Sequence, residues 1–180
     1  RPVFGPTEML LRVKAASVNP IDWKLRRGEM RFIWPLKFPY VPGFDVAGTV
    51  ESVGSEVDVW KPGDRVYAAL PNGGGHAEYV AIESNFCAAI PEGLSFEDAA
   101  SVPGGALSAL QALRDVGQIK AGDHVIVNGA SGGVGVFAVQ IGAAYGCRVT
   151  GVASKTNEHL VMSLGANRFV DYSREDVMQC

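Results

Sequence analysis

Four glycines within seven residues could hold a phosphate group. They lie in the stretch NGASGGVG, residues 128–135, between two apolar runs. When such a loop joins a strand to a helix, backbone N–H groups and the helix dipole converge on an anion. Glycine allows close approach to a pyrophosphate because it has no Cβ atom. With Ala130 in place of the first glycine of G-x-G-x-x-G, the stretch predicts a dinucleotide-binding loop, and a plain tight turn is the alternative.

The residues about twenty positions further along select the nucleotide, because an acid there accepts hydrogen bonds from an unphosphorylated ribose. Here the chain reads Ala153, Ser154 and Lys155, and its next carboxylate is Glu158. A hydroxyl followed by a cation suits a 2′-phosphate. The pattern therefore favours NADPH over NADH, although Lys155 taken on its own is more typical of a solvated surface lysine.

The segment after residue 95 predicts the elements that would position this loop. Ser95 and Asp98 resemble a capping box, and helix formers continue to Gly117. Three predicted strands, over 123–130, 148–153 and 168–172, alternate with two predicted helices. The first of these two helices is predicted to have one apolar face, formed by Val134, Phe137, Ala138, Ile141 and Tyr145. This β-α-β-α-β order indicates a parallel sheet.

Residues 9–90 have a different pattern. Short apolar segments alternate with Gly and Pro about every ten residues, which predicts a compact β-rich domain. One short helix is predicted after Asn19, with Pro20 in its first turn and Gly28 at its end. The chain is therefore expected to be an α/β protein with two domains, residues 1–95 and residues 96–180.

Composition limits the partners and the compartment. The 180 residues are 47% hydrophobic, carry a formal charge of −3 and have scattered Lys and Arg, so nucleic acid is not an expected partner. No apolar run approaches the roughly 20 residues that span a bilayer. Cys87, Cys147 and Cys180 are an odd number without metal-ligand spacing. We expect a soluble protein in a reducing compartment, the cytoplasm by default, with chloroplast or mitochondrion left open.

Seven motifs resemble the medium-chain dehydrogenase/reductase superfamily in order and spacing. They are SVNPIDWKLRRG, VPGFDVAGTVESVG, KPGDRV, HAEYV, SALQAL, NGASGGVG and SLGANRFVDY. The resemblance covers essentially the whole chain and is strongest to the zinc-free quinone oxidoreductase and enone reductase branch, which includes chloroplast-envelope quinone oxidoreductase homologues. It implies a GroES-like domain followed by the first half of a Rossmann dinucleotide-binding domain.

The same resemblance argues against a catalytic metal. Zinc-dependent members of the superfamily place a Cys and a His-Glu pair around zinc, and the matching positions here are Asn19, Phe44 and Asp45. Phe44 has no ligand atom, and one Asp with amide oxygens is a poor tetrahedral site. The superfamily's four-cysteine zinc lobe is also missing, because Cys87 is the only cysteine in the first domain. Cys87 is expected to be a packing residue.

Without a metal, the resemblance implies reduction of a quinone or an α,β-unsaturated carbonyl by hydride transfer from NADPH. Charge that develops on the carbonyl oxygen then needs a hydrogen-bond donor or a cation. Lys24 matches a lysine that reaches the carbonyl in some enone reductases, Asn19 would orient substrate or nicotinamide, and Trp23 would wall the pocket. The alternatives are an exposed helix lysine and a helix cap. His76 is assigned no role.

The resemblance also implies which residues contact the cofactor. Ser108 would lie near the nicotinamide, Ser131 to Val134 would line the pyrophosphate, and Tyr172 would join Ser154 and Lys155 at the 2′-phosphate. An ordinary strand-edge aromatic is the alternative for Tyr172. The full set of expected cofactor-binding residues is Ser108, Ala130, Ser131, Gly132, Gly133, Val134, Gly135, Ser154, Lys155 and Tyr172.

The predicted Rossmann domain stops after three of its usual six strands, which would leave a strand edge and apolar faces uncovered. We therefore expect a fragment, or a chain that needs a partner copy, and a homodimer for the full-length protein. Two alternatives to a quinone or enone reductase stay open. One is an NADPH-binding protein without turnover, like crystallin or vesicle-associated relatives, and the other is an enoyl-reductase module of a larger synthase.

Overall fold

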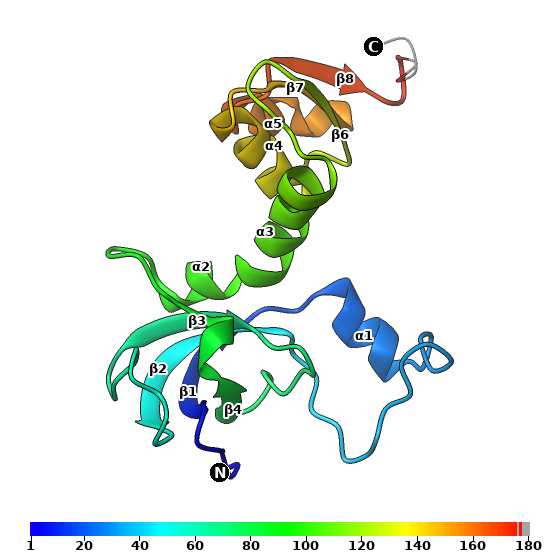
Figure 1. The fold of residues 1–180 in the computed structure, drawn as a ribbon. Coiled ribbons are helices and arrows are strands. Elements are labelled where there is room, and N and C mark those ends of the chain that lie inside the picture. Colours follow the sequence, from blue (N-terminus) through cyan, green and yellow to red (C-terminus); the bar gives the residue numbers. More distant parts are fainter. Residues whose placement is uncertain (176, 178–180) are drawn as a thin grey trace. The chain divides into compact units, whose positions relative to one another are not determined.

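The computed structural model describes residues 1–175 and 177 (Figure 1). Cys180 lies outside the described residues. The chain divides into two compact units, Arg1–Gly104 and Gly105–Cys180, and each is described by itself. None of the described helices is long and apolar enough to cross a membrane.

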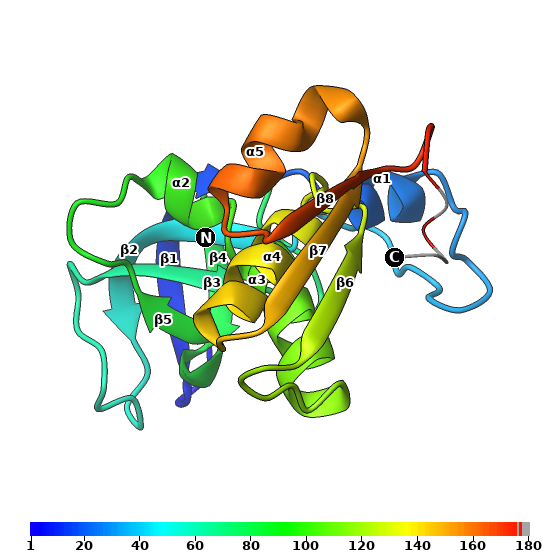
Figure 2. The same cartoon turned by 90° about the horizontal axis from the view of Figure 1, so that it is seen from above.

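The first unit is built on a five-stranded antiparallel sheet in the order β4-β1-β2-β3-β5 (Figure 2). Its strands are β1 (Glu8–Ala16), β2 (Asp45–Val53), β3 (Arg65–Ala69), β4 (Tyr79–Glu83) and β5 (Cys87–Ala89), with a 3-10 turn η1 (Ser84–Phe86) before β5. Strands β3 and β4 bury alternate side chains, whereas β1 and β2 each bury a run of consecutive residues. Met9, Leu11, Val46 and Val66 are fully buried members of the core. The β-rich first domain is therefore confirmed.

Cys87 packs against this core at the start of β5. Burial raises the pKa of its thiol to about 12. Because the thiolate is the reactive form of cysteine, Cys87 stays a protonated packing residue at neutral pH, as expected.

Two short helices flank the sheet. The helix α1 (Pro20–Arg26) has proline in its first turn, and Gly28 follows it with a φ of 73°. The helix α2 (Phe96–Ala100) is capped by Ser95, whose Oγ accepts the Asp98 N–H at 3.0 Å, and it packs on β2 and β1. Both predicted helix starts are confirmed.

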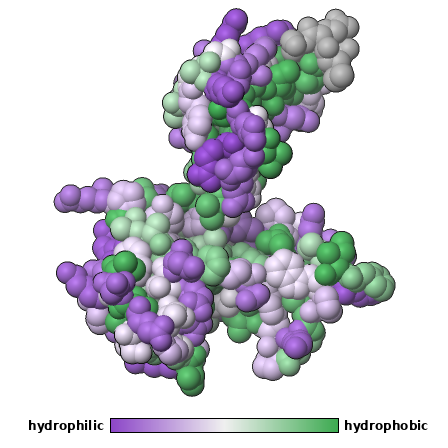
Figure 3. All heavy atoms as spheres, in the orientation of Figure 1, coloured by the Kyte–Doolittle hydropathy of each residue, from purple (hydrophilic) through white to green (hydrophobic). Residues whose placement is uncertain are grey.

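The segment between α1 and β2 presents apolar side chains to solvent. Phe32, Ile33 and Phe38 are each more than four-fifths exposed. Hydrophobic residues also show among hydrophilic ones over the rest of the visible surface (Figure 3).

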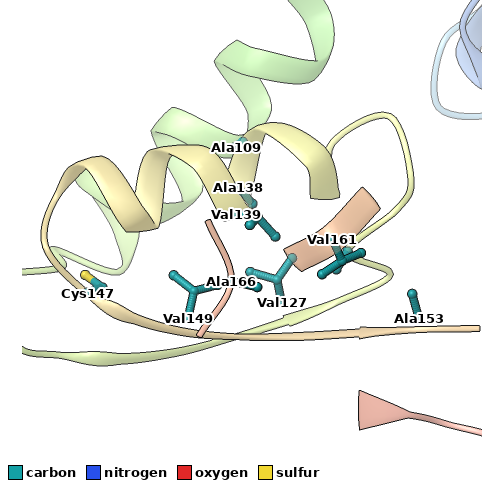
Figure 4. Packing of buried hydrophobic residues seen from close by; sticks show 10 residues of the cluster. Ala109, Val127, Ala138, Val139, Cys147, Val149, Ala153, Val161 and Ala166 are labelled. Carbon is teal, nitrogen blue, oxygen red and sulfur yellow. The ribbon is translucent and has the colours of Figure 1, made fainter. Parts of the chain in front are cut away.

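The second unit contains a parallel sheet in the order β6-β7-β8. Its strands are β6 (His124–Asn128), β7 (Arg148–Ala153) and β8 (Arg168–Asp171). Its helices are α3 (Pro103–Leu110), which starts at the unit boundary and continues as a π-helix η2 (Gln111–Val116), α4 (Gly135–Ala144), the 3-10 turn η3 (Lys155–Asn157) and α5 (Glu158–Ser163). Val127, Val149 and Val161 lie between the strands and the helices in one buried cluster (Figure 4). The α/β fold with half of a Rossmann sheet is confirmed.

The predicted apolar face of α4 is partly wrong. Val134 precedes the helix and is 46% exposed, and Tyr145, which follows it, is 37% exposed. The buried stripe is instead Gly135, Ala138, Val139 and Gly142. Small residues face the sheet because the helix lies close to it: a Cβ at Gly142 would be 3.0 Å from Val149 Cγ2.

A glycine in β7 tests this close packing. A Cβ at Gly151 would overlap Val161 Cγ1, so we expect Gly151→Ala to lower the free energy of unfolding by about 1–3 kcal/mol. Val161→Ala removes the overlapping atom, so the double variant is expected to be more stable than the sum of the single effects by roughly 0.5 kcal/mol or more. Urea unfolding of the four proteins measures this coupling, and additive effects would contradict the packing described.

Candidate functional site

The glycine loop leaves β6 and enters α4 in a tight path. The N–H groups of Gly129 and Ala130 both donate to the carbonyl of Val152 in β7, at 3.0 and 2.9 Å. Gly129 has a φ of 75°, which favours glycine. A Cβ at Gly135 would overlap the carbonyl oxygen of Gly129. Gly129 and Gly135 are therefore required by the loop's own geometry.

The middle of the loop faces solvent. Gly133 is exposed, and a Cβ there would meet no atom within 4 Å. Within residues 1–175 and 177, the backbone N–H groups of Ser131, Gly133 and Val134 donate to no protein acceptor. These donors lie immediately before α4, whose N-terminus favours negative charge. The arrangement is chemically suited to an anion such as a pyrophosphate.

Asn157 connects the glycine loop to the end of β7, and the sequence analysis missed it. Its Nδ2 donates to Ser131 Oγ at 3.0 Å and to Ser154 Oγ at 3.1 Å. The structure thus brings together two of the predicted cofactor residues, one before α4 and one after β7. Only its position beside Lys155 could have suggested Asn157 in advance.

The remaining predicted cofactor residues differ in burial and in contacts. Lys155 is paired with Glu158, with 2.5 Å between Nζ and Oε2. Tyr172 is 61% exposed directly after β8, and Ser108 is exposed on α3. Ala130 is fully buried, so its contribution to the loop is through the backbone.

Asp171, at the end of β8, is a buried acid in the second unit that the sequence analysis did not consider. Hydrogen bonds from the Ser173 hydroxyl and the Ser173 N–H lower its pKa. It therefore remains a carboxylate at neutral pH, near the end of the sheet from which Tyr172 emerges.

The first unit contains a buried polar cluster around Asp45. Asn19 Nδ2 donates to Asp45 Oδ2 at 2.7 Å and to Ser17 Oγ at 3.1 Å. The Ser17 hydroxyl also donates to Asp45 Oδ2, at 3.1 Å. Burial raises the pKa of Asp45, whereas these hydrogen bonds act in the opposite direction. The Asn19 amide is thus held in a fixed orientation by a carboxylate.

Asp22 fixes α1 to the segment before β2. Its Oδ2 accepts the Asn19 N–H and its Oδ1 accepts the Gly43 N–H, both at 2.7 Å. The sequence analysis gave no role to Asp22, because a polar residue inside a short amphipathic helix carries no local signal of its long-range partner.

Beside Asp22 lies a half-open hollow of about 260 Å³. It is lined by Val18, Asp22, Trp23, Arg26, Pro42 and His76. The predicted pocket residue Trp23 thus lines a hollow. Lys24 is exposed and does not line it; its Nζ lies 5.6 Å from the centroid of the Trp23 ring.

The residues at the superfamily's zinc positions make other contacts. The Phe44 ring meets Trp34 edge-on, with 5.8 Å between ring centroids. Asn19 and Asp45 bond to each other through the contact described above. Among the residues that the structure describes, no group of three or more His, Cys, Asp or Glu side chains could hold a metal ion. The side chains of Asn19, Phe44 and Asp45 do not fit a tetrahedral zinc site.

Comparison with known proteins agrees with this arrangement. Residues 5–92 match the family model of the alcohol dehydrogenase GroES-like domain. A chloroplastic quinone-oxidoreductase homolog from Spinacia oleracea is 41% identical over 172 residues, covering 92% of this chain and 52% of that protein. The chain therefore contains an alcohol dehydrogenase GroES-like domain at residues 5–92 and is similar to quinone oxidoreductases.

Solved structures extend this likeness across both units. An alcohol dehydrogenase superfamily protein from Novosphingobium aromaticivorans matches with a TM-score of 0.90 and 37% identity, over 97% of this chain and 54% of that one. Escherichia coli quinone oxidoreductase, solved in complex with NADPH, matches with a TM-score of 0.86 and 30% identity, over 99% and 55%. The chain spans about half the length of the relatives it matches.

The buried Asp45 carboxyl is expected to make the stability of the fold depend on pH. Its raised pKa means that the folded state holds the proton more tightly than the unfolded chain, where the value is 3.8. The stability it contributes is therefore present below that pH and is lost as pH rises through the folded pKa. We expect Asp45→Asn to remove this fall. Urea unfolding between pH 3.5 and pH 7 measures the free energy of unfolding of both proteins. The same dependence of that free energy on pH in the wild type and in Asp45→Asn would contradict the prediction.

Proposed function

We propose that this chain is part of an NADPH-dependent, zinc-independent oxidoreductase that reduces quinones or α,β-unsaturated carbonyl compounds. The observation that carries the proposal is the glycine loop, where backbone donors of Ser131, Gly133 and Val134 lie before the N-terminus of α4. A bound nicotinamide cofactor would supply the hydride. Proteins named quinone oxidoreductase among the relatives, one of them in complex with NADPH, support this class of reaction.

The residues after β7 support the choice of NADPH. Lys155 supplies a cation and Ser154 a hydroxyl, and Asn157 holds Ser154 beside the loop. Glu158 competes for the same cation. Because the Lys155–Glu158 pair is exposed and therefore weak, a doubly charged 2′-phosphate can take over the lysine.

The first unit supports a reaction without metal. Asn19 donates to Asp45 Oδ2, and the Phe44 side chain has no atom that can bind a metal. Reduction of a conjugated carbonyl needs only a donor or cation for the oxygen that becomes negative, whereas oxidation of an alcohol would lack the Lewis acid that stabilises an alkoxide. We assign substrate binding to the hollow that Trp23 lines.

The test is NADPH oxidation by the full-length protein, treated with a chelator, against a panel of quinones, short enals and cyclic enones. We expect turnover with at least one of these acceptors and no loss of rate after chelation. Binding of NADPH without oxidation by any acceptor would favour a non-catalytic relative. Loss of activity after metal removal, restored by zinc, would contradict the proposal.

Substitution of Gly133 tests the effect of the loop on NADPH binding without an effect on folding. Because a Cβ there meets no protein atom, Gly133→Ala is expected to keep the wild-type Tm and to weaken NADPH binding by about tenfold or more, roughly 1.4 kcal/mol. The matched variant Gly135→Ala is expected to lower the free energy of unfolding by about 1–3 kcal/mol, because its Cβ overlaps Gly129. Calorimetric titration and thermal melts measure both. Unchanged NADPH affinity in Gly133→Ala would contradict the proposal that the glycine loop binds NADPH.

The nucleotide preference is tested by three charge variants. Lys155→Ala is expected to raise the Kd for NADPH about tenfold, about 1.4 kcal/mol, and to leave the Kd for NADH unchanged. Glu158→Gln is expected to tighten NADPH binding because the competing carboxylate is gone. Lys120→Ala removes an exposed lysine elsewhere in the same unit and serves as the control. Equal effects of Lys155→Ala on both nucleotides would rule out the proposed 2′-phosphate contact.

A further inference from the structure

We propose that His76 is a catalytic residue of this site and that its imidazole donates the proton that quinone or enone reduction consumes. The inference rests on the proposed function and assigns its proton donor. The sequence pattern favoured Lys24 for this role and gave none to His76. Three observations in the first unit change that assignment.

The first observation is the orientation of the imidazole. His76 Nε2 lies 2.9 Å from the carbonyl oxygen of Ser17. A carbonyl can only accept, so Nε2 carries a hydrogen. The Cδ2 atom lies against the backbone of Gly43, where a Cβ would be only 2.6 Å away. The Nε2–Cδ2 edge therefore faces the protein. Because His76 as a whole is exposed, we assign the proton transfer to Nδ1 on the opposite edge.

The second observation is that this histidine is rigidly mounted. The His76 N–H donates to the carbonyl of Pro42, and the Gly75 N–H donates to that of Gly43, both at 2.9 Å. The Gly43 N–H in turn donates to Asp22 in α1 at 2.7 Å. These bonds fix the backbone that carries His76, and the Nε2 hydrogen bond to Ser17 fixes the ring, as a preorganised proton donor requires.

The third observation is the set of residues that line the hollow together with His76. Val18, Trp23 and Pro42 supply apolar and aromatic walls, which suit the flat ring of a quinone or cyclic enone. The charged groups that line it with His76 are Asp22, whose two oxygens already accept N–H groups, and Arg26.

Two further cations lie outside the hollow. Lys24 and Arg27 are placed over the Trp23 ring, at 5.6 and 4.9 Å from its centroid, and neither lines the hollow. Of the side chains that line it, His76 is the one of the type that most often serves as a general acid or base.

The step balances with one reductant and one proton. A bound NADPH would supply the hydride, and with it the two electrons that reduce the conjugated system, leaving NADP⁺. The imidazolium of His76 transfers the proton on Nδ1 to the carbonyl oxygen. The ring is left neutral with its hydrogen on Nε2, still donating to Ser17, and regains a proton from solvent at its exposed edge.

The experiment compares pH–rate profiles of the full-length wild type, His76→Gln and Lys24→Met. Gln keeps an N–H donor for the Ser17 carbonyl but cannot titrate. We expect the wild-type kcat/KM to fall as pH rises, because the reaction then lacks its proton donor. His76→Gln is expected to lose roughly 100-fold in kcat at pH 6 and to lose this pH dependence, with the Kd for NADPH unchanged. Lys24→Met is expected to keep the wild-type profile.

The controls separate the possible outcomes. His159→Gln, an exposed histidine on α5, is expected to behave as the wild type. A His76→Gln enzyme with the kcat and pH profile of the wild type would overturn the assignment. So would a wild-type enzyme whose kcat/KM does not fall as pH rises, and this second result does not depend on the folding of any variant. Loss of the profile in Lys24→Met alone would overturn it in favour of Lys24. Absence of turnover in the wild type would overturn the proposed function itself.

Discussion

The close approach of the Gly135 backbone to the Gly129 carbonyl is the constraint on which the second unit depends. Any side chain at position 135 would overlap that oxygen, so α4 could not begin where it does. The helix then lies against β7 through small residues, and its N-terminus follows directly on the exposed loop. A loop built this way presents backbone donors to solvent instead of to its own chain. The packing requirement and the expected anion site are two results of the same geometry.

The first unit has a comparable constraint, made of hydrogen bonds. Asp22 joins α1 to the segment before β2, and Asp45 holds the Asn19 amide beside Ser17. Buried carboxylates are costly unless they are hydrogen-bonded. Backbone N–H groups satisfy both oxygens of Asp22, and Asn19 and Ser17 donate to Asp45 Oδ2. Asn19 and Asp45, two of the three residues that the sequence resemblance aligns with zinc ligands, thus belong to a hydrogen-bond network. In our account, this network positions the hollow and the imidazole of His76.

The strands and their order along the chain could be predicted because periodicity and turn residues are local signals. The glycine loop was also predictable, since its flanking strand and helix are local. The burial of α4 was not, because glycines at the helix–sheet contact have no hydrophobic signature. Asn157, Asp22 and His76 were missed for a related reason: each acts through a partner that only the folded chain brings near. Their residue types are common on any surface, so spacing alone does not reveal them.

The central claim is hydride transfer from NADPH to a conjugated carbonyl without metal, and one measurement tests it directly. The full-length, chelator-treated protein is mixed with a cyclic enone and NADPH deuterated at the transferred C4 position, and a single turnover is followed. The account predicts slower oxidation than with unlabelled NADPH, and deuterium bound to carbon in the reduced product. A product without deuterium, or no NADPH oxidation until zinc is added, would contradict it.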